Sequence, residues 1–274
     1  MRQVAPGDTV LVAPGRYSDL NGTHYASFNP AVSGTAEAPI VFRSCPHLGA
    51  VLVSASNIQA AFATSRDYIV VDGFRVEGTL KVQGGQHCVL MNNEVVYGSM
   101  ETSGSGTPDP SLNWGIALHT ATFNVVRNNR VHDMADSGDN GHNAACMMVG
   151  FESHDNIIEH NFADAGGGTV YAAFSTKGRG VTDNVWRYNI AAGATAAYFG
   201  IGSTDGSSPS ERNHFHDNVA LRSVAAFELD HGCLDYEIAG NTAVECETFL
   251  YGGFGSDEWV NNRASGTTSR SWRT

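Results

Sequence analysis

Several short apolar segments of this sequence end in side chains that can carry out acid–base chemistry. Because successive residues of a strand point to opposite faces, one face of each segment is expected to be apolar and the other polar. We expect the outward positions to hold His119, Glu152, Tyr171, Tyr198, Glu228 and Asp230, with Lys177 and His231 at the turns that follow. Groups of these types can transfer protons during cleavage of a glycosidic bond. The pattern predicts a carbohydrate groove or, on the simpler interpretation, a solvated outer face.

The carboxylates in this set are compatible with three kinds of chemistry. A glycoside hydrolase needs two carboxyl groups, which Glu228 and Asp230 supply from one face of a strand. Lysis of a uronic-acid polymer needs a base for the proton next to the sugar carboxylate, and a cation or arginine to hold that carboxylate. Glu152 and Glu228 could also serve as oxygen ligands of Ca²⁺. The residue types leave these alternatives open.

Composition narrows the class of protein and of partner. The chain has 274 residues, a formal net charge of −12 and 31 glycines, and only 16% of it is charged. This profile is typical of a packed, β-rich protein with many turns. Nucleic acid is not an expected partner, because phosphate binding needs a basic face. No run of 18 apolar residues is present, so no membrane span is predicted.

Targeting and cysteine usage give two weaker expectations. The sequence enters structure at once, without an apolar signal region, so we expect a cytoplasmic protein or one whose secretion signal has been removed. In the second case the protein would be extracellular or periplasmic. The five cysteines are odd in number and have no Cys-x-x-Cys spacing. We expect them to be buried as small apolar residues.

A repeated phrase, Asn-φ-φ-x-x-Asn-x-φ with φ apolar, predicts the fold. Its second asparagine recurs at Asn93, Asn129, Asn161, Asn189, Asn218, Asn241 and Asn262, while the spacing falls from 36 to 21 residues. A spacing of about 21 residues allows three short strands and three turns, which is one coil of a β-helix. We predict an all-β, single-stranded, right-handed parallel β-helix of about nine to ten coils, formed by one domain over residues 1–274. Stacked coils would place the asparagines in a column with hydrogen-bonded amides.

Strand alternation also predicts the interior of the solenoid. The residues expected to point inward are Ile116, Leu118, Val126, Val170, Phe174, Trp186, Phe199, Ile201, Phe227 and Leu229. A register error of one residue would turn a strand inside out. Segments 99–113, 133–143 and 203–211 are long enough to form loops beside the outward face.

The sequence resembles the pectate-lyase-like β-helix proteins in the phrases at 5–17, 38–43 and 68–74. The order of these phrases is similar to that in the alginate lyase and chondroitinase B group of polysaccharide lyases. Segment 175–189 is similar to the segment that holds the catalytic lysine of that group, which implies that Lys177 is the base. The group's catalytic arginine lies in an Arg-His-Gly phrase, whose counterpart here is Asp230 followed by His231. The resemblance implies a polysaccharide lyase with Ca²⁺ as a candidate cofactor.

The remaining candidates would bind substrate or other partners. We expect His119 and Tyr198 to assist catalysis, and the groups that bind the sugar to be Tyr171, Glu152, Glu228, Tyr251 and Arg179. The expected partner is a polysaccharide. The alternative is a non-catalytic β-helix, such as a carbohydrate-binding, surface or phage-type protein. Self-association through the two ends of the solenoid is a further expectation, because end strands leave unpaired backbone groups.

Overall fold

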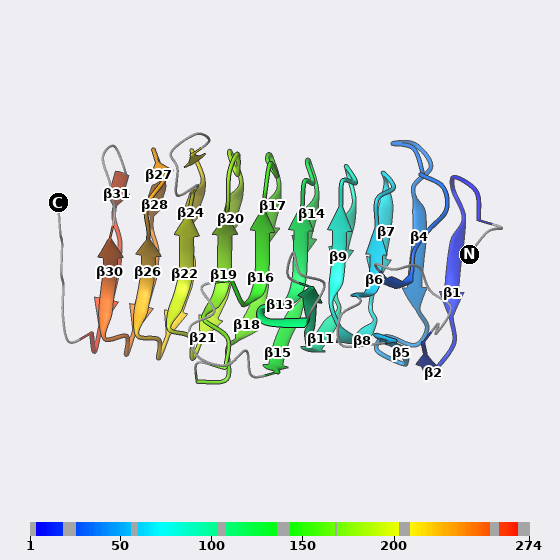
Figure 1. The fold of residues 1–274 in the computed structure, drawn as a ribbon, viewed down its shortest axis with the longest axis horizontal. Coiled ribbons are helices and arrows are strands. Elements are labelled where there is room, and N and C mark those ends of the chain that lie inside the picture. Colours follow the sequence, from blue (N-terminus) through cyan, green and yellow to red (C-terminus); the bar gives the residue numbers. More distant parts are fainter. Residues whose placement is uncertain are drawn as a thin grey trace.

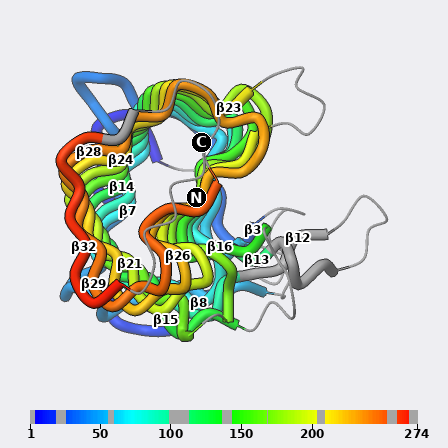
Figure 2. Tube along the Cα trace, turned by 90° about the vertical axis from the view of Figure 1, so that its left-hand side faces the viewer, coloured from blue at the N-terminus to red at the C-terminus, as the bar shows by residue number. Residues whose placement is uncertain are grey.

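The computed structural model describes residues 4–18, 26–55, 60–102, 108–135, 143–167, 169–202, 209–252 and 258–267. Figure 1 shows these segments wound into coils that follow one another along the long axis, with the two termini at opposite ends. Figure 2 looks along the stack, where successive coils superpose. The regular structure in these ranges consists of strands and turns. The arrangement is a right-handed parallel β-helix, as the repeated phrase predicted.

Each coil contributes one strand to each of three parallel sheets, called here sheets A, B and C. Sheet A contains β1 (Thr9–Val12), β4 (Ile40–Ser44), β7 (Ile69–Asp72), β10 (Val89–Met91), β14 (Val125–Arg127), β17 (Ile157–Glu159), β20 (Val185–Arg187), β24 (His214–His216), β28 (Glu237–Ala239) and β31 (Glu258–Val260). Sheet B contains β2 (Gly15–Tyr17), β5 (Ala50–Val53), β8 (Arg75–Gly78), β11 (Glu94–Tyr97), β15 (Arg130–Met134), β18 (Phe162–Asp164), β21 (Ile190–Ala192), β25 (Val219–Leu221), β29 (Thr242–Val244) and β32 (Arg263–Ser265).

Sheet C carries the candidate site. It contains β3 (Ala26–Phe28), β6 (Ala60–Thr64), β9 (Leu80–Gln83), β13 (Pro108–His119), β16 (Ala145–Gly150), β19 (Ala172–Lys177), β22 (Ala196–Ile201), β26 (Ala225–Leu229) and β30 (Thr248–Gly252). Two small additions lie off this path: β12 (Ser99–Thr102) pairs antiparallel with β13, and β23 (Ser210–Glu211) pairs with β27 (Cys233–Leu234).

The interior is a continuous apolar core that runs along the stack. In sheet A, the parallel register places Ile158, Trp186, Phe215 and Ile238 in one inward column. Leu118 and Leu229 in sheet C are each 1% exposed, which confirms their predicted inward position. Four of the five cysteines are also buried, whereas Cys45 is exposed. No helix in the described ranges has the length and hydropathy needed to cross a membrane.

Two columns of asparagine fix the turns of successive coils. In the first, each side-chain amide bonds to the asparagine of the next coil, from Asn93 through Asn262, as for Asn161 Nδ2 to Asn189 Oδ1 at 3.0 Å. A second column follows the other asparagine of the phrase, from Asn124 to Asn213. The amide ladder predicted from the sequence is therefore confirmed, and a bonded amide satisfies turn groups that would otherwise be buried without partners.

One strand has the opposite orientation to the prediction. In β22, Tyr198 points into the core, where its ring stacks on Phe174 at 5.2 Å and on Phe227 at 5.0 Å. Phe199 and Ile201 lie instead on the outer side of sheet C, in an apolar cluster separate from the main core. Both faces of β22 are apolar, so alternation alone could not distinguish them. Parts of the predicted loops, residues 103–107, 136–142 and 203–208, lie outside the described ranges.

Candidate active site

The outer side of sheet C changes from apolar to polar along the stack. Pairing of β16, β19, β22, β26 and β30 forms one outward column, Met148, Ser175, Phe199, Glu228 and Tyr251. The apolar residues of this face pack into one cluster, which extends from Trp114 in the N-terminal direction to Phe199 and Ile201 in β22. Polar groups therefore gather over β26 and β30, where the apolar cluster ends.

A partly buried hydrogen bond between Tyr171 and Glu228 lies in the polar part of this face. The Tyr171 hydroxyl lies 2.8 Å from both carboxylate oxygens of Glu228, to which it donates. Glu228 is only 8% exposed, which is unusual for a carboxylate. Burial, together with the hydrogen bond to Glu228, raises the pKa of Tyr171 well above its ordinary value. Tyr171 therefore stays protonated and acts as a donor over the whole physiological range.

An open groove of about 420 Å³ lies beside this pair. Its walls include Tyr171, Glu228, Asp230 and Tyr251, and Tyr251 is 61% exposed. Asp230 accepts a hydrogen bond at 2.8 Å from Nδ1 of His231 at the next position. An exposed aromatic ring next to carboxyl and imidazole groups suits a sugar ring, which has an apolar face and a polar rim.

Lys177 lies at the end of β19, on the same side of the sheet. Its side chain is mostly buried, and this desolvation lowers the pKa of Lys177 to about 8, while the nearby charge of Asp230 opposes the change. An amine with such a pKa is substantially unprotonated just above neutral pH, so it can act as a base. Asp230 thus lines the groove and also acts electrostatically on Lys177.

The hydrogen bond between Tyr171 and Glu228 gives a stability prediction. Replacing Tyr171 by phenylalanine is expected to lower the free energy of unfolding by about 1–3 kcal/mol, because the buried carboxylate loses the donor supplied by the hydroxyl. Urea denaturation of the variant would measure this change. Tyr251→Phe is the matched control, with an expected change within about 0.5 kcal/mol, because its ring is exposed. Equal stability of Tyr171→Phe and wild type would contradict the prediction.

Other predicted site residues do not join this group. Tyr198 is 1% exposed in the core, where it donates to the backbone oxygen of Asn189 at 3.0 Å, so its predicted catalytic role is wrong. Glu152 forms an ion pair with Arg179 at 3.2 Å, at the turns after β16 and β19. His119 lies in the same register column as Lys177, separated from it by β16. That separation is about 10 Å between backbones, so His119 is outside direct reach of the groove.

The two glutamates expected to bind calcium do not fit a shared ion. Ca²⁺ takes six to eight oxygen ligands at short range. Glu152 follows β16 and Glu228 lies in β26, three strand spacings away, which is about 14 Å. Among the described residues, no group of three or more His, Cys, Asp or Glu side chains is placed to hold a metal ion.

The structure adds groove residues that the sequence reasoning missed. Thr195 and Val224 line the groove together with Thr248. Tyr171, Thr195 and Val224 each precede an alanine, and those three alanines are paired in adjacent strands. Aligning the coils on these alanines in the sequence would have placed the three residues in one column.

Comparison with known proteins supports the architecture. No protein-family model matches the sequence, and no curated protein matches it. Among solved structures, pectate lyase Pel9A is similar to this chain with a TM-score of 0.69 and 18% identity, over 97% of this chain and 69% of that one. An alginate lyase from Paenibacillus sp. str. FPU-7 has a TM-score of 0.59 and 15% identity, over 97% and 93% of the chains.

A surface adhesin of Streptococcus pneumoniae, PfbA, is also similar, with a TM-score of 0.50 and 9% identity over 96% of this chain and 84% of that one. These identities are low, so the likeness concerns the fold. The chain has the pectate-lyase-like right-handed parallel β-helix fold that its opening phrases resemble. Because this fold is found in both lyases and an adhesin, function must be argued from the site.

Proposed function

We propose that this protein is a polysaccharide lyase that cleaves a uronic-acid polymer on the outer face of sheet C. The observation that supports this proposal is Lys177, whose burial lowers its pKa to about 8 on the same face as the groove. A base of this strength is suited to removing a proton from carbon near neutral pH. Such a substrate lies outside the cytoplasm, so an extracellular or periplasmic location belongs to the proposal.

In the proposed reaction, the neutral amine of Lys177 takes the proton from the carbon next to the sugar carboxylate. The electron pair of that C–H bond forms a double bond to the neighbouring carbon, and the glycosidic C–O bond there breaks. A water molecule bound to His231, which Asp230 holds at 2.8 Å, supplies a proton to the departing oxygen. Arg179, two residues after Lys177, exchanges its exposed ion pair with Glu152 for the sugar carboxylate. Tyr251 offers its exposed ring to a sugar.

Hydrolysis by Glu228 and Asp230 is the second candidate, because both line the groove. One experiment separates the two reactions. Purified protein is incubated with alginate, pectate, chondroitin and neutral glycans, with and without added Ca²⁺, and both reducing ends and ultraviolet absorbance are followed. New reducing ends with absorbance from an unsaturated product support elimination. Reducing ends without absorbance would replace it with hydrolysis, and no cleavage of any glycan would favour a non-catalytic role.

The pKa of Lys177 also predicts how cleavage depends on pH. Because the base must be unprotonated, kcat/KM is expected to rise about tenfold per pH unit below pH 8 and to level off above it. Initial rates at constant ionic strength between about pH 6 and about pH 9 would measure this profile. Arg179→Lys keeps the charge near the site and should retain the same inflection. A rate that is independent of pH over this range would exclude Lys177 as the base.

A further inference from the structure

A second and larger groove lies on another side of the same coils, along the corner between sheets A and B. It has a volume of about 1,200 Å³. Residues of β20, β24, β28 and the start of β32 line it. The groove therefore crosses the coils that carry Lys177 and Glu228, but on a different side of the solenoid.

Small residues in one coil produce the hollow. At the turn from sheet A to sheet B, two successive coils carry Arg187–Tyr188 and His216–Asp217. The next coil has Ala239 and Gly240 at these positions, and Ala239 is paired with His216. A Cβ atom on Gly240 would lie 2.6 Å from Oδ1 of Asp217, so a larger residue would enter the groove wall. Neighbouring coils thus form walls around a floor of small side chains.

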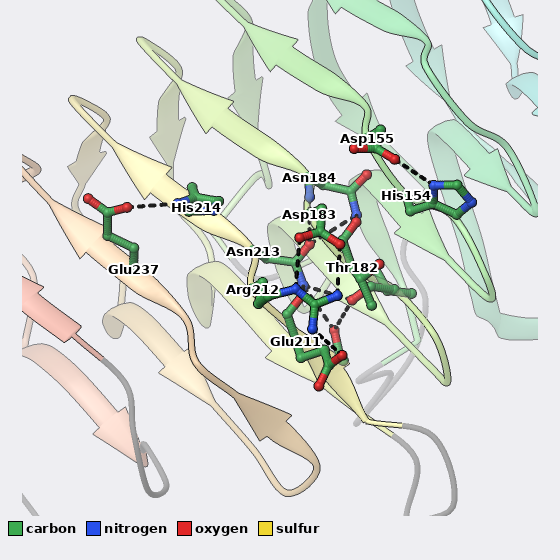
Figure 3. Close-up of polar contacts among 12 residues, drawn as sticks. His154, Asp155, Thr182, Asp183, Asn184, Glu211, Arg212, Asn213, His214 and Glu237 are labelled. Atoms are coloured by element: carbon green, nitrogen blue, oxygen red, sulfur yellow. Dashed lines mark hydrogen bonds and ion pairs between the residues drawn. The ribbon is translucent and has the colours of Figure 1, made fainter.

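Most charged groups of this groove are held by partners within the protein. Arg187 donates to Glu159 at 2.7 and 2.9 Å, one coil away. His214 bonds to Glu237 at 2.7 Å, as Figure 3 shows. His216 bonds to Asp217 at 3.0 Å. In the same view, Arg212 is held by Asp183 and Glu211, which removes it as a candidate for ligand binding.

Arg263 differs from these groups. It begins β32, lines the groove and is exposed. None of the ion pairs formed among the described residues includes Arg263. A planar guanidinium that forms no ion pair with a described carboxylate is suited to bidentate binding of a carboxylate from a ligand.

An aromatic ring lies at the rim of the same groove. Tyr188 is 47% exposed and stacks on His160 with ring centroids 5.0 Å apart. The ring also forms a T-shaped pair with that of His216, a lining residue, with ring centroids 6.0 Å apart. The ring is therefore held by imidazole rings of both neighbouring coils, and nearly half of the residue is still exposed. Fixed, exposed tyrosine is suited to contact with the apolar face of a sugar.

We propose that this groove is a second glycan-binding site, which holds a carboxylate-bearing stretch of polysaccharide without cleaving it. Arg263 binds a sugar carboxylate, Tyr188 covers a sugar ring, and Thr242 and Asn261 form hydrogen bonds with hydroxyl groups. The carboxylates of Asp217 and Glu237 beside the groove disfavour a densely charged phosphate polymer. The site does not depend on the chemistry of Lys177, so it extends the function proposed above.

Native electrophoresis in gels that contain alginate or polygalacturonate tests this site without any cleavage. All proteins carry Lys177→Met, so that failure of the proposed lyase reaction cannot affect the result. Arg263→Ala is expected to weaken retardation by the acidic polymers about tenfold or more, because a charge-assisted pair is lost. Tyr188→Asn should weaken it as well. Asparagine occupies the same turn position at Asn92 and Asn128 with the same positive φ, so the turn should be preserved.

The matched control is Arg127→Ala. Arg127 is an exposed arginine of sheet A two coils before Arg187, outside the groove. Retardation of the Arg127→Ala variant by the acidic polymers should equal that of the parent protein. A gel with neutral glucan should retard none of the proteins. Equal affinities for Arg263→Ala and Arg127→Ala would overturn the proposal. So would a lack of retardation by both acidic polymers, or stronger binding to a DNA gel.

Discussion

Replacing Lys177 by methionine is expected to abolish cleavage of an acidic polysaccharide and to raise the stability of the protein at neutral pH. Loss of a catalytic base lowers kcat by about 10²–10⁴-fold. The same amine is costly to the fold, because burial lowers its pKa from 10.5 to about 8. That lowering corresponds to about 3 kcal/mol as an upper limit. A site that is strained for function commonly gains stability when its functional group is removed.

The size of the stability gain in Lys177→Met depends on pH. Between about pH 8 and pH 10.5 the unfolded chain holds the Lys177 proton and the folded chain does not. In this window the stability of wild type rises with pH, because the unfolded state binds more protons. The advantage of Lys177→Met should therefore be constant below about pH 8 and disappear toward pH 10.5.

Urea unfolding of both proteins at a series of pH values would measure this difference. Arg179→Met serves as the control, because it removes a cation from the same turn. The Arg179 side chain is 62% exposed, so little change in the free energy of unfolding is expected. A destabilised Lys177→Met variant at pH 7 would show that the amine is held by favourable contacts. Wild-type cleavage by that variant would place the base elsewhere.

Replacing Asn189 by alanine, in the middle of the ladder, is expected to be strongly destabilising. Its Oδ1 accepts from the backbone N–H and the Nδ2 of Asn161, at 2.9 and 3.0 Å. The Nδ2 of Asn189 donates to the backbone oxygen of Ile158 at 2.8 Å and to Oδ1 of Asn218 at 3.1 Å. Each buried group left without its partner costs about 1–3 kcal/mol, and the sum is less than additive, so a loss of about 3–5 kcal/mol is expected.

Two further variants make this prediction specific. Asn262→Ala removes three such bonds at a less buried position near the end of the ladder, so it should cost about 1–2 kcal/mol. Asn128→Gly changes an exposed asparagine with positive φ outside the ladder, where glycine is well tolerated. Thermal unfolding followed by circular dichroism would rank the three proteins. Similar Tm values for Asn189→Ala and Asn128→Gly would contradict the prediction that the hydrogen bonds of the ladder stabilise the fold.

The fold could be predicted because its most constrained elements recur in the sequence. The asparagine phrase repeats at every coil from Asn93 onward, and the structure stacks those side chains as expected. The predicted side-chain orientation was wrong in β22, where Tyr198 and Phe199 are both buried. Tyr198 lies in the core and Phe199 lies in the apolar cluster on the outer side of the sheet. Apolar character marks burial, but it does not say from which side a residue is covered.

The candidate site was only partly predictable for a related reason. Alternation correctly placed Glu228 on the outer face, where its partner in β30 is Tyr251. The contact between Tyr171 and Glu228 spans 57 residues of sequence and depends on the stacking of coils, which local patterns do not encode. The groove lined by Arg263 likewise arises from small residues in one coil beside large ones in the preceding coil.

The two asparagine columns also determine where this chain can change in length during evolution. The asparagines of one phrase are always five residues apart, as for Asn184 and Asn189, whereas the distance to the next phrase varies from 36 to 21 residues. A single insertion between the paired asparagines would displace one ladder against the other. An insertion in a loop, or duplication of a complete coil, would leave both ladders in register. The protein can thus gain a new binding loop or a longer groove without redesigning its interior, one coil of about 4.8 Å at a time.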